Sequence, residues 1–360
     1  MKTSRKTAIM AVTGGLAAVA FLAGCSSGQA STSSSSAPAA AVEGTSIVVY
    51  SPQGADTRGP YIAAAAKKAL GVTIKFVSGA GGILTTRLLA EKNNTQADVV
   101  LGLGEAQINQ VAAAGILQPF TPSWANDVPG ALRGSYKDFT LATQTPIVVA
   151  YNTAKMSASE APSSWLDLAK PEFKNKFTFP AIASQTGQAA AVGILWRFAD
   201  HKTGNVSTKG WSTLSKIMAN SVQVSAGQAF DFATVKSGAQ PIVVTYLGGL
   251  QTAERDNNLD LKIVNGMGGS PYVQTGVGLV KDTSHQAAAK AFINWYGTAK
   301  FQVPFVKATN NDTPVNSAAV KELGSTTKIL SSISKQNIDW GIVTAHLTAW
   351  LQKIQLGGNS

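Results

Sequence analysis

The sequence has one cysteine, Cys25, and three histidines among its 360 residues. No thiol follows Cys25, so disulfide bridges, thiolate metal sites and cysteine nucleophiles are excluded from the rest of the chain. The histidines lie far apart without any His-x-x-His spacing, which predicts surface positions rather than a metal site. They are His201, His285 and His346.

Common catalytic motifs are missing as well. The sequence has no Gly-x-Ser-x-Gly nucleophile elbow, no Gly-x-x-x-x-Gly-Lys-Ser/Thr loop and no His-Glu-x-x-His pair. The glycine-rich segment 79–84 has Leu84 where a dinucleotide-binding loop needs its third glycine. We therefore predict that the protein is not an enzyme and needs no cofactor and no metal. A secreted enzyme is the alternative class, and a surface adhesin is a third.

The chain has no apolar run of membrane-spanning length. The longest, Ala8–Leu22, has about 15 residues and follows three cations, whereas a spanning helix needs roughly 20. A basic start, a short apolar core and small residues before a cleavage point are typical of an export signal, here residues 1–24. A thiol directly after Ala23-Gly24 resembles the lipobox of bacterial lipoproteins. That resemblance implies that Cys25 is acylated and anchors the protein to the outer face of the cell membrane; an ordinary secretory signal is the alternative.

Within residues 25–45, the stretch 26–43 is almost wholly Ser, Ala, Thr and Gly. Such a segment cannot bury enough apolar surface to offset its ordering entropy, so we predict a flexible tether. Removing residues 1–24 lowers the formal net charge from +11 to +8. The remaining cations are scattered rather than interleaved with aromatics, which predicts no nucleic-acid partner and favours a solvated basic surface near anionic lipid.

The rest of the chain alternates β-branched runs with amphipathic segments, which predicts an α/β fold with mostly parallel sheets and flanking helices. About 315 residues exceed one typical core and suit two lobes. The short runs 147–151 and 241–246 are the expected crossings between them. We place residues 46–145 plus 247–310 in lobe 1 and residues 146–246 plus 311–356 in lobe 2.

Several segments resemble the substrate-binding components of ABC importers, in the subgroup that binds ferric iron, thiamine or phosphonates (extracellular solute-binding protein family 1). The segments are 48–51 (VVYS), 97–103 (ADVVLGL), 114–120 (AGILQPF), 149–152 (VAYN), 165–174 (WLDLAKPEFK) and 293–296 (INWY). The resemblance covers about residues 46–355. It implies a two-lobed periplasmic-binding-protein type 2 (Venus-flytrap) fold with two crossover strands. It also implies a monomer that delivers a small-molecule solute to ABC permease subunits.

Loops that follow strands and precede helices are expected to face the cleft, where free backbone N–H groups favour a negative ligand group. The Ser184-Gln185-Thr186-Gly187 turn is the best candidate. The alternative is that its hydroxyls only cap a helix, and that the tyrosines are core residues. The expected ligand-binding residues are Ser51, Gln53, Ser78, Gly79, Gly102, Gly104, Tyr151, Ser184, Thr186, Gly187, Tyr246 and Tyr272.

The chain lacks residues that the iron-binding members of this subgroup carry, and this absence guides the prediction of the ligand. Iron-binding members carry two adjacent tyrosines where this chain has Tyr246 followed by Leu247, and an early acid where it has Gly102-Leu103-Gly104. Ferric iron prefers anionic oxygen ligands, and thiamine needs a carboxylate that is not evident. We therefore expect a small polar or anionic solute of the phosphonate or phosphate-ester type, with ferric iron and thiamine as the alternatives.

Overall fold

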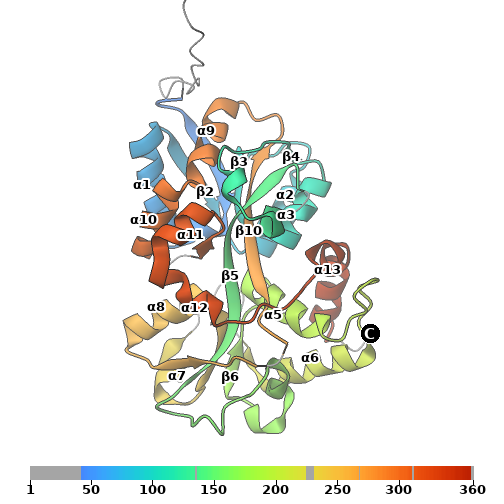
Figure 1. Ribbon diagram of the computed structural model, residues 1–360. Coiled ribbons are helices and arrows are strands. Elements are labelled where there is room, and N and C mark those ends of the chain that lie inside the picture. The colour runs from blue at the N-terminus through green and yellow to red at the C-terminus, as the bar shows by residue number, and fades with distance from the viewer. Residues whose placement is uncertain (1–41, 134–135, 224–230, 267, 310–311, 358–360) are drawn as a thin grey trace, which may run out of the picture. The chain divides into compact units, whose positions relative to one another are not determined.

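The fold is built on a mixed β-sheet in which two antiparallel strands, β10 (Tyr272–Val280) and β5 (Phe139–Asn152), separate two outer sets of three parallel strands (Figure 1). This computed structural model describes residues 42–133, 136–223, 231–266, 268–309 and 312–357. They belong to one compact unit, Ala39–Ser360. The predicted export signal, the lipidation site Cys25 and most of the predicted tether lie outside the described residues. None of the helices in the described ranges is long and apolar enough to cross a membrane.

The main path of the sheet runs β2-β1-β3-β10-β5-β8-β6-β7, with β4, β9 and β11 attached beside it. The strands are β1 (Ser46–Ser51), β2 (Thr73–Ser78), β3 (Val99–Gly104), β4 (Leu117–Gln118), β5 (Phe139–Asn152), β6 (Phe177–Phe179), β7 (Val222–Gln223), β8 (Ile242–Tyr246), β9 (Leu261–Ile263), β10 (Tyr272–Val280) and β11 (Thr313–Pro314). β1 is parallel to β2 and β3, and β6 is parallel to β7 and β8. β10 and β5 run antiparallel to their neighbours, so the sheet is mixed.

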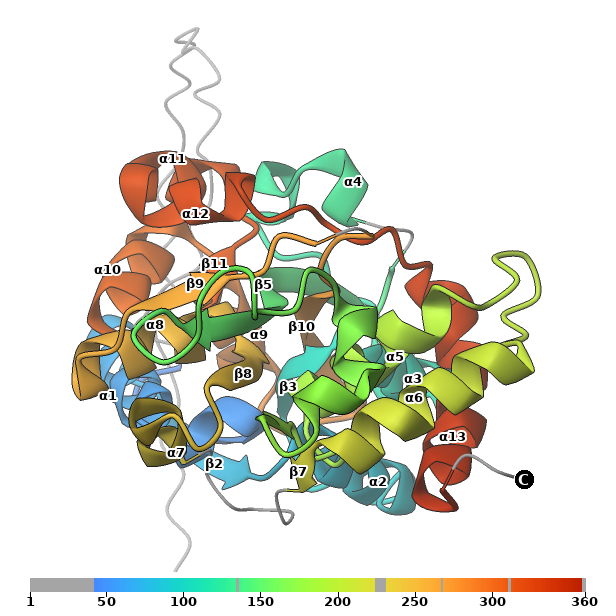
Figure 2. The ribbon, with the colours of Figure 1, turned by 90° about the horizontal axis from the view of Figure 1, so that it is seen from below.

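The sheet has two parts: β2, β1, β3, β10 and the first half of β5 form one, and the second half of β5 with β8, β6 and β7 forms the other. Helices cover both parts, as Figure 1 and Figure 2 show. They are α1 (Arg58–Leu70), α2 (Gly81–Ala90), α3 (Glu105–Ala113), α4 (Gly130–Arg133), α5 (Gln185–Trp196), α6 (Thr208–Asn220), α7 (Phe232–Ser237), α8 (Leu247–Asn257), α9 (Gln286–Tyr296), α10 (Ala299–Thr309), α11 (Ser317–Leu323), α12 (Lys328–Ser331) and α13 (Trp340–Gln355). The segments Trp165–Ala169 and Pro171–Phe173 form 3₁₀ turns. α13 lies against α3 in both views.

Side chains of β3 alternate between two cores because successive residues of a strand point to opposite faces. Val99 and Leu101 belong to the core formed with α1, α9 and α10. Val100 belongs to the core formed with α2 and α3, and so does Leu103, because the strand shifts register at Gly102 (φ 77°). This strand is therefore buried on both faces, as expected for a sheet with helices on each side.

β5 behaves in the same way in the other part of the sheet. Ile147 and Val149 pack into the core with α5, α6 and α13, whereas Val148 and Ala150 pack with α7 and α8. The first half of β5 pairs with β10, and its second half pairs with β8 and β9. β5 is thus the strand that continues from one part of the sheet into the other.

The predicted alternation of strands and helices is confirmed, but the predicted crossings differ in one respect. The run 147–151 lies in the strand that joins the two parts, but the run predicted as the second crossing, 241–246, becomes β8 and pairs with β5 and β6. The long partner of β5 at the passage is β10 instead, with Tyr272 opposite Pro146. The sequence also gave no sign of α8. The proposed lobe boundaries stay a prediction.

Candidate functional site

A cavity of about 160 Å³ opens where the carboxyl ends of β1 and β3 meet the start of α5. We call it the cleft cavity. Its size suits a solute smaller than a drug-sized molecule, for which pockets of roughly 300–1,000 Å³ are usual. The cleft cavity is lined by Pro52, Gln53, Arg58, Ala80, Gly81, Gly102, Thr145, Ile147, Ser184, Gln185, Thr186, Tyr246, Val273, Thr275 and Asp312. Five of the twelve predicted site residues are among them: Gln53, Gly102, Ser184, Thr186 and Tyr246.

The N-terminus of α5 forms one wall of the cleft cavity. The Ser184 hydroxyl accepts a hydrogen bond from the Gly187 N–H at 3.0 Å and donates to the carbonyl oxygen of Ala181 at 2.7 Å. The backbone N–H groups of Gln185 and Thr186 fall in the first turn, where a helix supplies no internal acceptor. These N–H groups, with the positive end of the helix dipole, favour an anionic group in the cavity.

Arg58, the first residue of α1, contributes a positive charge to the cleft cavity. Its guanidinium donates to both carboxylate oxygens of Asp56, with Nη2–Oδ2 at 2.7 Å and Nε–Oδ1 at 2.9 Å. Burial by itself would lower the pKa of Arg58, but the hydrogen bond to Asp56 and the charge of Asp312 raise it above its ordinary value. A guanidinium held in this way is a fixed, permanent positive charge beside the cavity, which favours an anionic ligand group.

Gln53 and Tyr246 bring polar groups to the same cavity. Gln53 is buried in the 3₁₀ turn after β1, and its Oε1 accepts a hydrogen bond from the Tyr296 hydroxyl at 3.0 Å. Tyr246 is the last residue of β8 and precedes α8, and burial raises the pKa of its hydroxyl. The phenol is therefore neutral at physiological pH and able to donate a hydrogen bond.

Asp312 and Thr145 were not predicted, although both line the cleft cavity. Thr145 belongs to the polar half of β5, and Asp312 directly precedes β11, which pairs with β5. The carboxyl group of Asp312 is buried, and its Oδ1 accepts no hydrogen bond from the described residues. Burial raises the pKa of Asp312, while the Arg58 charge and the Thr145 hydroxyl oppose this rise.

Four predicted site residues lie outside the lining of the cleft cavity, and three of them are buried. Ser51 is fully buried at the end of β1 and accepts a hydrogen bond from the Gln53 N–H at 3.1 Å. Tyr151 is a core residue of β5. Tyr272 is buried and donates to the carbonyl oxygen of Ile333 at 3.2 Å. Ser78 is exposed at the end of β2.

The three remaining predicted residues are glycines beside the cleft cavity. Gly79 follows β2 and is not among the lining residues. Gly104 ends β3, where its N–H donates to Gln107 Oε1 at 3.3 Å. The Gly187 N–H is taken by Ser184, and a β-carbon at this position would lie 2.6 Å from the carbonyl oxygen of Pro180. The absence of a side chain at Gly187 therefore allows the first turn of α5 to pack closely on the backbone of Pro180 and Ala181.

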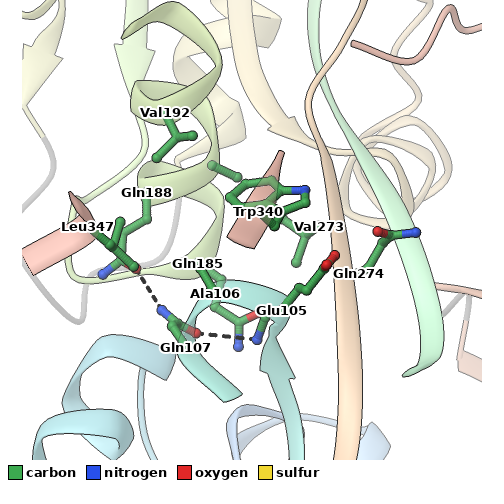
Figure 3. Close-up of a pocket in the computed structure, with 12 residues that line it drawn as sticks. Glu105, Ala106, Gln107, Gln185, Gln188, Val192, Val273, Gln274, Trp340 and Leu347 are labelled. Atoms are coloured by element: carbon green, nitrogen blue, oxygen red, sulfur yellow. Dashed lines mark hydrogen bonds between the residues drawn. The ribbon is translucent and has the colours of Figure 1, made fainter. Parts of the chain in front are cut away.

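Hydrogen bonds close the cleft cavity on the side of α3. Gln185 Nε2 donates to the Gly102 carbonyl oxygen at 2.8 Å. Gln107 Nε2 donates to Gln188 Oε1 at 2.6 Å, and Figure 3 shows these two side chains reaching toward each other from α3 and α5. Gln107 and Gln188 also line a smaller, largely apolar hollow of about 30 Å³, together with Glu105 and Trp340.

A larger hollow of about 420 Å³ lies among α2, α5 and α13, but its lining has no charged side chain. The cleft cavity combines an arginine, an aspartate and a helix N-terminus, so it is the candidate binding site. In the part of the chain that the structure describes, no three His, Cys, Asp or Glu side chains gather as ligands for a metal ion.

Solved structures of periplasmic binding proteins have the same fold. A ferric binding protein from Campylobacter jejuni superimposes with a TM-score of 0.73 at 18% identity, covering 87% of this chain and 99% of that one. A periplasmic binding protein from Actinobacillus pleuropneumoniae with fructose-6-phosphate bound gives a TM-score of 0.74 at 18% identity, covering 87% of this chain and all of that one. The two-lobed fold expected from the sequence is thereby confirmed.

Sequence relatives point the same way. A protein of Sinorhizobium fredii named as an ABC transporter periplasmic-binding protein is 35% identical over 311 residues, 86% of each chain. A periplasmic protein of Salmonella typhimurium named for binding 2-aminoethylphosphonate is 31% identical over 238 residues, 63% of this chain and 65% of its own. The family model of bacterial extracellular solute-binding proteins matches residues 61–329. The chain therefore belongs to the bacterial extracellular solute-binding proteins that serve ABC transporters.

Proposed function

We propose that this protein captures a small phosphonate or phosphate ester in the cleft cavity and delivers it to the permease of an ABC importer. The observation that carries the proposal is the convergence of Arg58 with the N-terminus of α5 on one cavity. Both features favour a compact anion with several oxygen atoms. The relative named for 2-aminoethylphosphonate binding supports this ligand class.

The solute would be held by donors from several elements. The N–H groups of Gln185 and Thr186 and the Thr186 hydroxyl would meet the phosphonate oxygens from one side, and Arg58 from the other. Because these donors come from both parts of the sheet, a bound anion would favour the conformation in which α1 and α5 approach each other. Ligand capture is then a population shift toward a closed form, which the permease would recognise.

The N-terminal segment would keep the protein near that permease. Residues 1–24 would direct export, acylated Cys25 would anchor the chain to the outer face of the membrane, and residues 26–45 would serve as a tether. A Cys25→Ser variant tests this role by membrane fractionation. Release of the variant into the soluble fraction is expected, whereas retention with the membrane would contradict the anchor. We expect the folded unit to act as a monomer.

Ferric iron is the second candidate, because a Serratia marcescens relative named as an Fe(3+)-binding periplasmic protein is 29% identical over 240 residues. The cleft cavity offers Tyr246 and Asp312 as oxygen ligands, beside the positive charge of Arg58. A cation beside a permanently charged guanidinium is disfavoured, so we rank iron, and thiamine with it, below the phosphonates.

Native mass spectrometry of the protein purified from its host tests the proposal by the mass of any solute that remains bound. Titration calorimetry with ethylphosphonate, inorganic phosphate, ferric citrate and thiamine then compares the classes. Binding of a phosphorus compound, weakened about 10- to 100-fold in Arg58→Gln by loss of a charged hydrogen bond, is expected. Binding of ferric ion or thiamine alone would contradict the proposal.

A further inference from the structure

A carboxyl group, that of Asp312, is an unusual lining group for a site that binds an anion, because a carboxylate repels negative charge. Asp312 is only 7% exposed and lines the cleft cavity. Its Oδ1 has no hydrogen-bond partner among the described residues, although a buried polar atom is nearly always paired. Leaving a buried acceptor without a partner costs stability. The presence of the Asp312 carboxyl group in a binding site therefore suggests that it contacts the ligand.

An ion pair with Arg58 does not explain why the carboxyl group of Asp312 is buried in the cavity. The guanidinium of Arg58 already contacts both oxygens of Asp56, the shorter contact being 2.7 Å. Within the described ranges, Asp312 forms no ion pair at 4 Å or less, whereas Arg58 and Asp56 do. The cavity thus contains a second carboxylate beyond the one that holds the arginine.

We propose, on the basis of the proposed function, that the solute is a zwitterion whose ammonium group donates to Asp312 while its phosphonate or phosphate group is held by Arg58 and the N-terminus of α5. An anion without a positive group would bring like charge toward Asp312 in a partly desolvated cavity, which is unfavourable. An ammonium supplies the missing donor and removes that repulsion. The small size of the cavity favours a short link between the two charges.

The same geometry explains why Asp312 tolerates burial. Burial raises the pKa of its carboxyl group, and the Arg58 charge together with Thr145 acts in the opposite direction. A ligand ammonium would add to that opposite effect and favour the ionised form.

A matched pair of ligands tests the proposal: 2-aminoethylphosphonate and ethylphosphonate, which lacks only the amino group. We expect the wild-type protein to bind the amino compound about 10- to 100-fold more tightly, as for one charge-assisted hydrogen bond. In Asp312→Asn this preference should vanish, with ethylphosphonate bound at least as well as before. Asp256→Asn is the control, because it removes one exposed acid that pairs with Arg255, and it should keep the preference.

The outcomes separate this inference from the proposed function. Equal affinity of the wild-type protein for the two compounds, or a preference that survives in Asp312→Asn, would overturn the ammonium site and leave phosphonate binding intact. Binding of neither compound would overturn the ammonium site, and binding of no phosphorus compound at all would overturn the proposed function as well. A preference that is lost only in Asp312→Asn supports both.

Discussion

At the scale of single residues, the site combines positions that the sequence indicated with others that it could not. Ser184 and Thr186 follow from a Ser-x-Thr-Gly turn before a helical pattern, because such turns cap helices and bind anions. Arg58 had a weaker signal, a cation at a helix start two residues after Asp56. Asp312 had none, since no periodic pattern surrounds it and its neighbours in the cavity lie far away in sequence.

The first prediction separates capping from ligand contact at α5. Ser184 Oγ bonds to the Gly187 N–H and the Ala181 carbonyl oxygen, so Ser184→Ala should lower the free energy of unfolding by about 1 kcal/mol. Thr186→Ala should leave stability within about 0.5 kcal/mol and weaken ethylphosphonate binding about tenfold, the effect of one lost hydrogen bond. Urea unfolding and calorimetry measure the two effects. Equal losses of affinity in both variants would contradict the division of roles.

The second prediction concerns the pH dependence of Asp312. Burial raises the pKa of this carboxyl in the folded protein, so its favourable contribution to folding is complete below the ordinary pKa and is lost as the pH rises through the raised value. At pH 7, Asp312→Asn should therefore stabilise the unliganded protein by about 1–3 kcal/mol. The gain should shrink toward about pH 4, near the ordinary pKa of aspartic acid.

Thermal unfolding across this pH range checks the prediction, with Asp256→Asn as the exposed control. A wild-type protein more stable than Asp312→Asn at pH 7 would show that the carboxylate is well paired in the folded state. It would also remove the argument from burial for an ammonium site.

At the scale of elements, most helices and strands could be predicted because their apolar residues keep one period. The exceptions lie where the chain turns toward the site. β5 begins at Phe139, but its half before Ile147 contains Thr143, Gln144, Thr145 and Pro146, which hide the strand. α8 begins Leu247-Gly248-Gly249, and two glycines lower helix propensity. Tertiary packing of Leu247 and Leu250 decides the helix instead.

The third prediction tests the packing of α5 on the loop before it. A β-carbon added at Gly187 would collide with the Ala181 carbonyl oxygen and lie 2.6 Å from that of Pro180. Because backbone atoms cannot move aside as a flexible side chain does, Gly187→Ala should cost about 1–3 kcal/mol of stability and weaken ligand binding. Gly130→Ala in α4 is the control, since a β-carbon there meets nothing within 4 Å. Unchanged stability of Gly187→Ala would refute the tight turn.

At the scale of the whole molecule, the Venus-flytrap class could be predicted, because alternating strands and helices with lipoprotein and binding-protein motifs converge on it. The contacts across the cleft could not be predicted, because their partners lie far apart in the sequence. Gln107 and Gln188 are 81 positions apart, and Gly102 and Gln185 are 83 positions apart. Side chains paired over such distances leave no trace in local periodicity. These hydrogen bonds are the elements that a transition between open and closed forms would break and remake.

The fourth prediction concerns that transition. Gln188→Ala removes the hydrogen bond with Gln107, a buried neutral pair expected to stabilise the closed form by about 1 kcal/mol. We expect weaker ligand binding by about fivefold and a larger radius of gyration of the unliganded protein in X-ray scattering. Gln96→Ala is the control, because this exposed side chain bonds only within its own loop, to Asn94, among the described residues. Scattering and affinity unchanged in Gln188→Ala would contradict the link between this contact and closure.

The most direct test of the account is a crystal structure of the protein grown with 2-aminoethylphosphonate. We predict phosphonate density in the cleft cavity, with oxygen atoms within hydrogen-bonding distance of the Thr186 backbone N–H and the Arg58 guanidinium, and the amino group at Asp312. Density for the compound outside the cavity, or a cavity holding only water at saturating ligand, would contradict it.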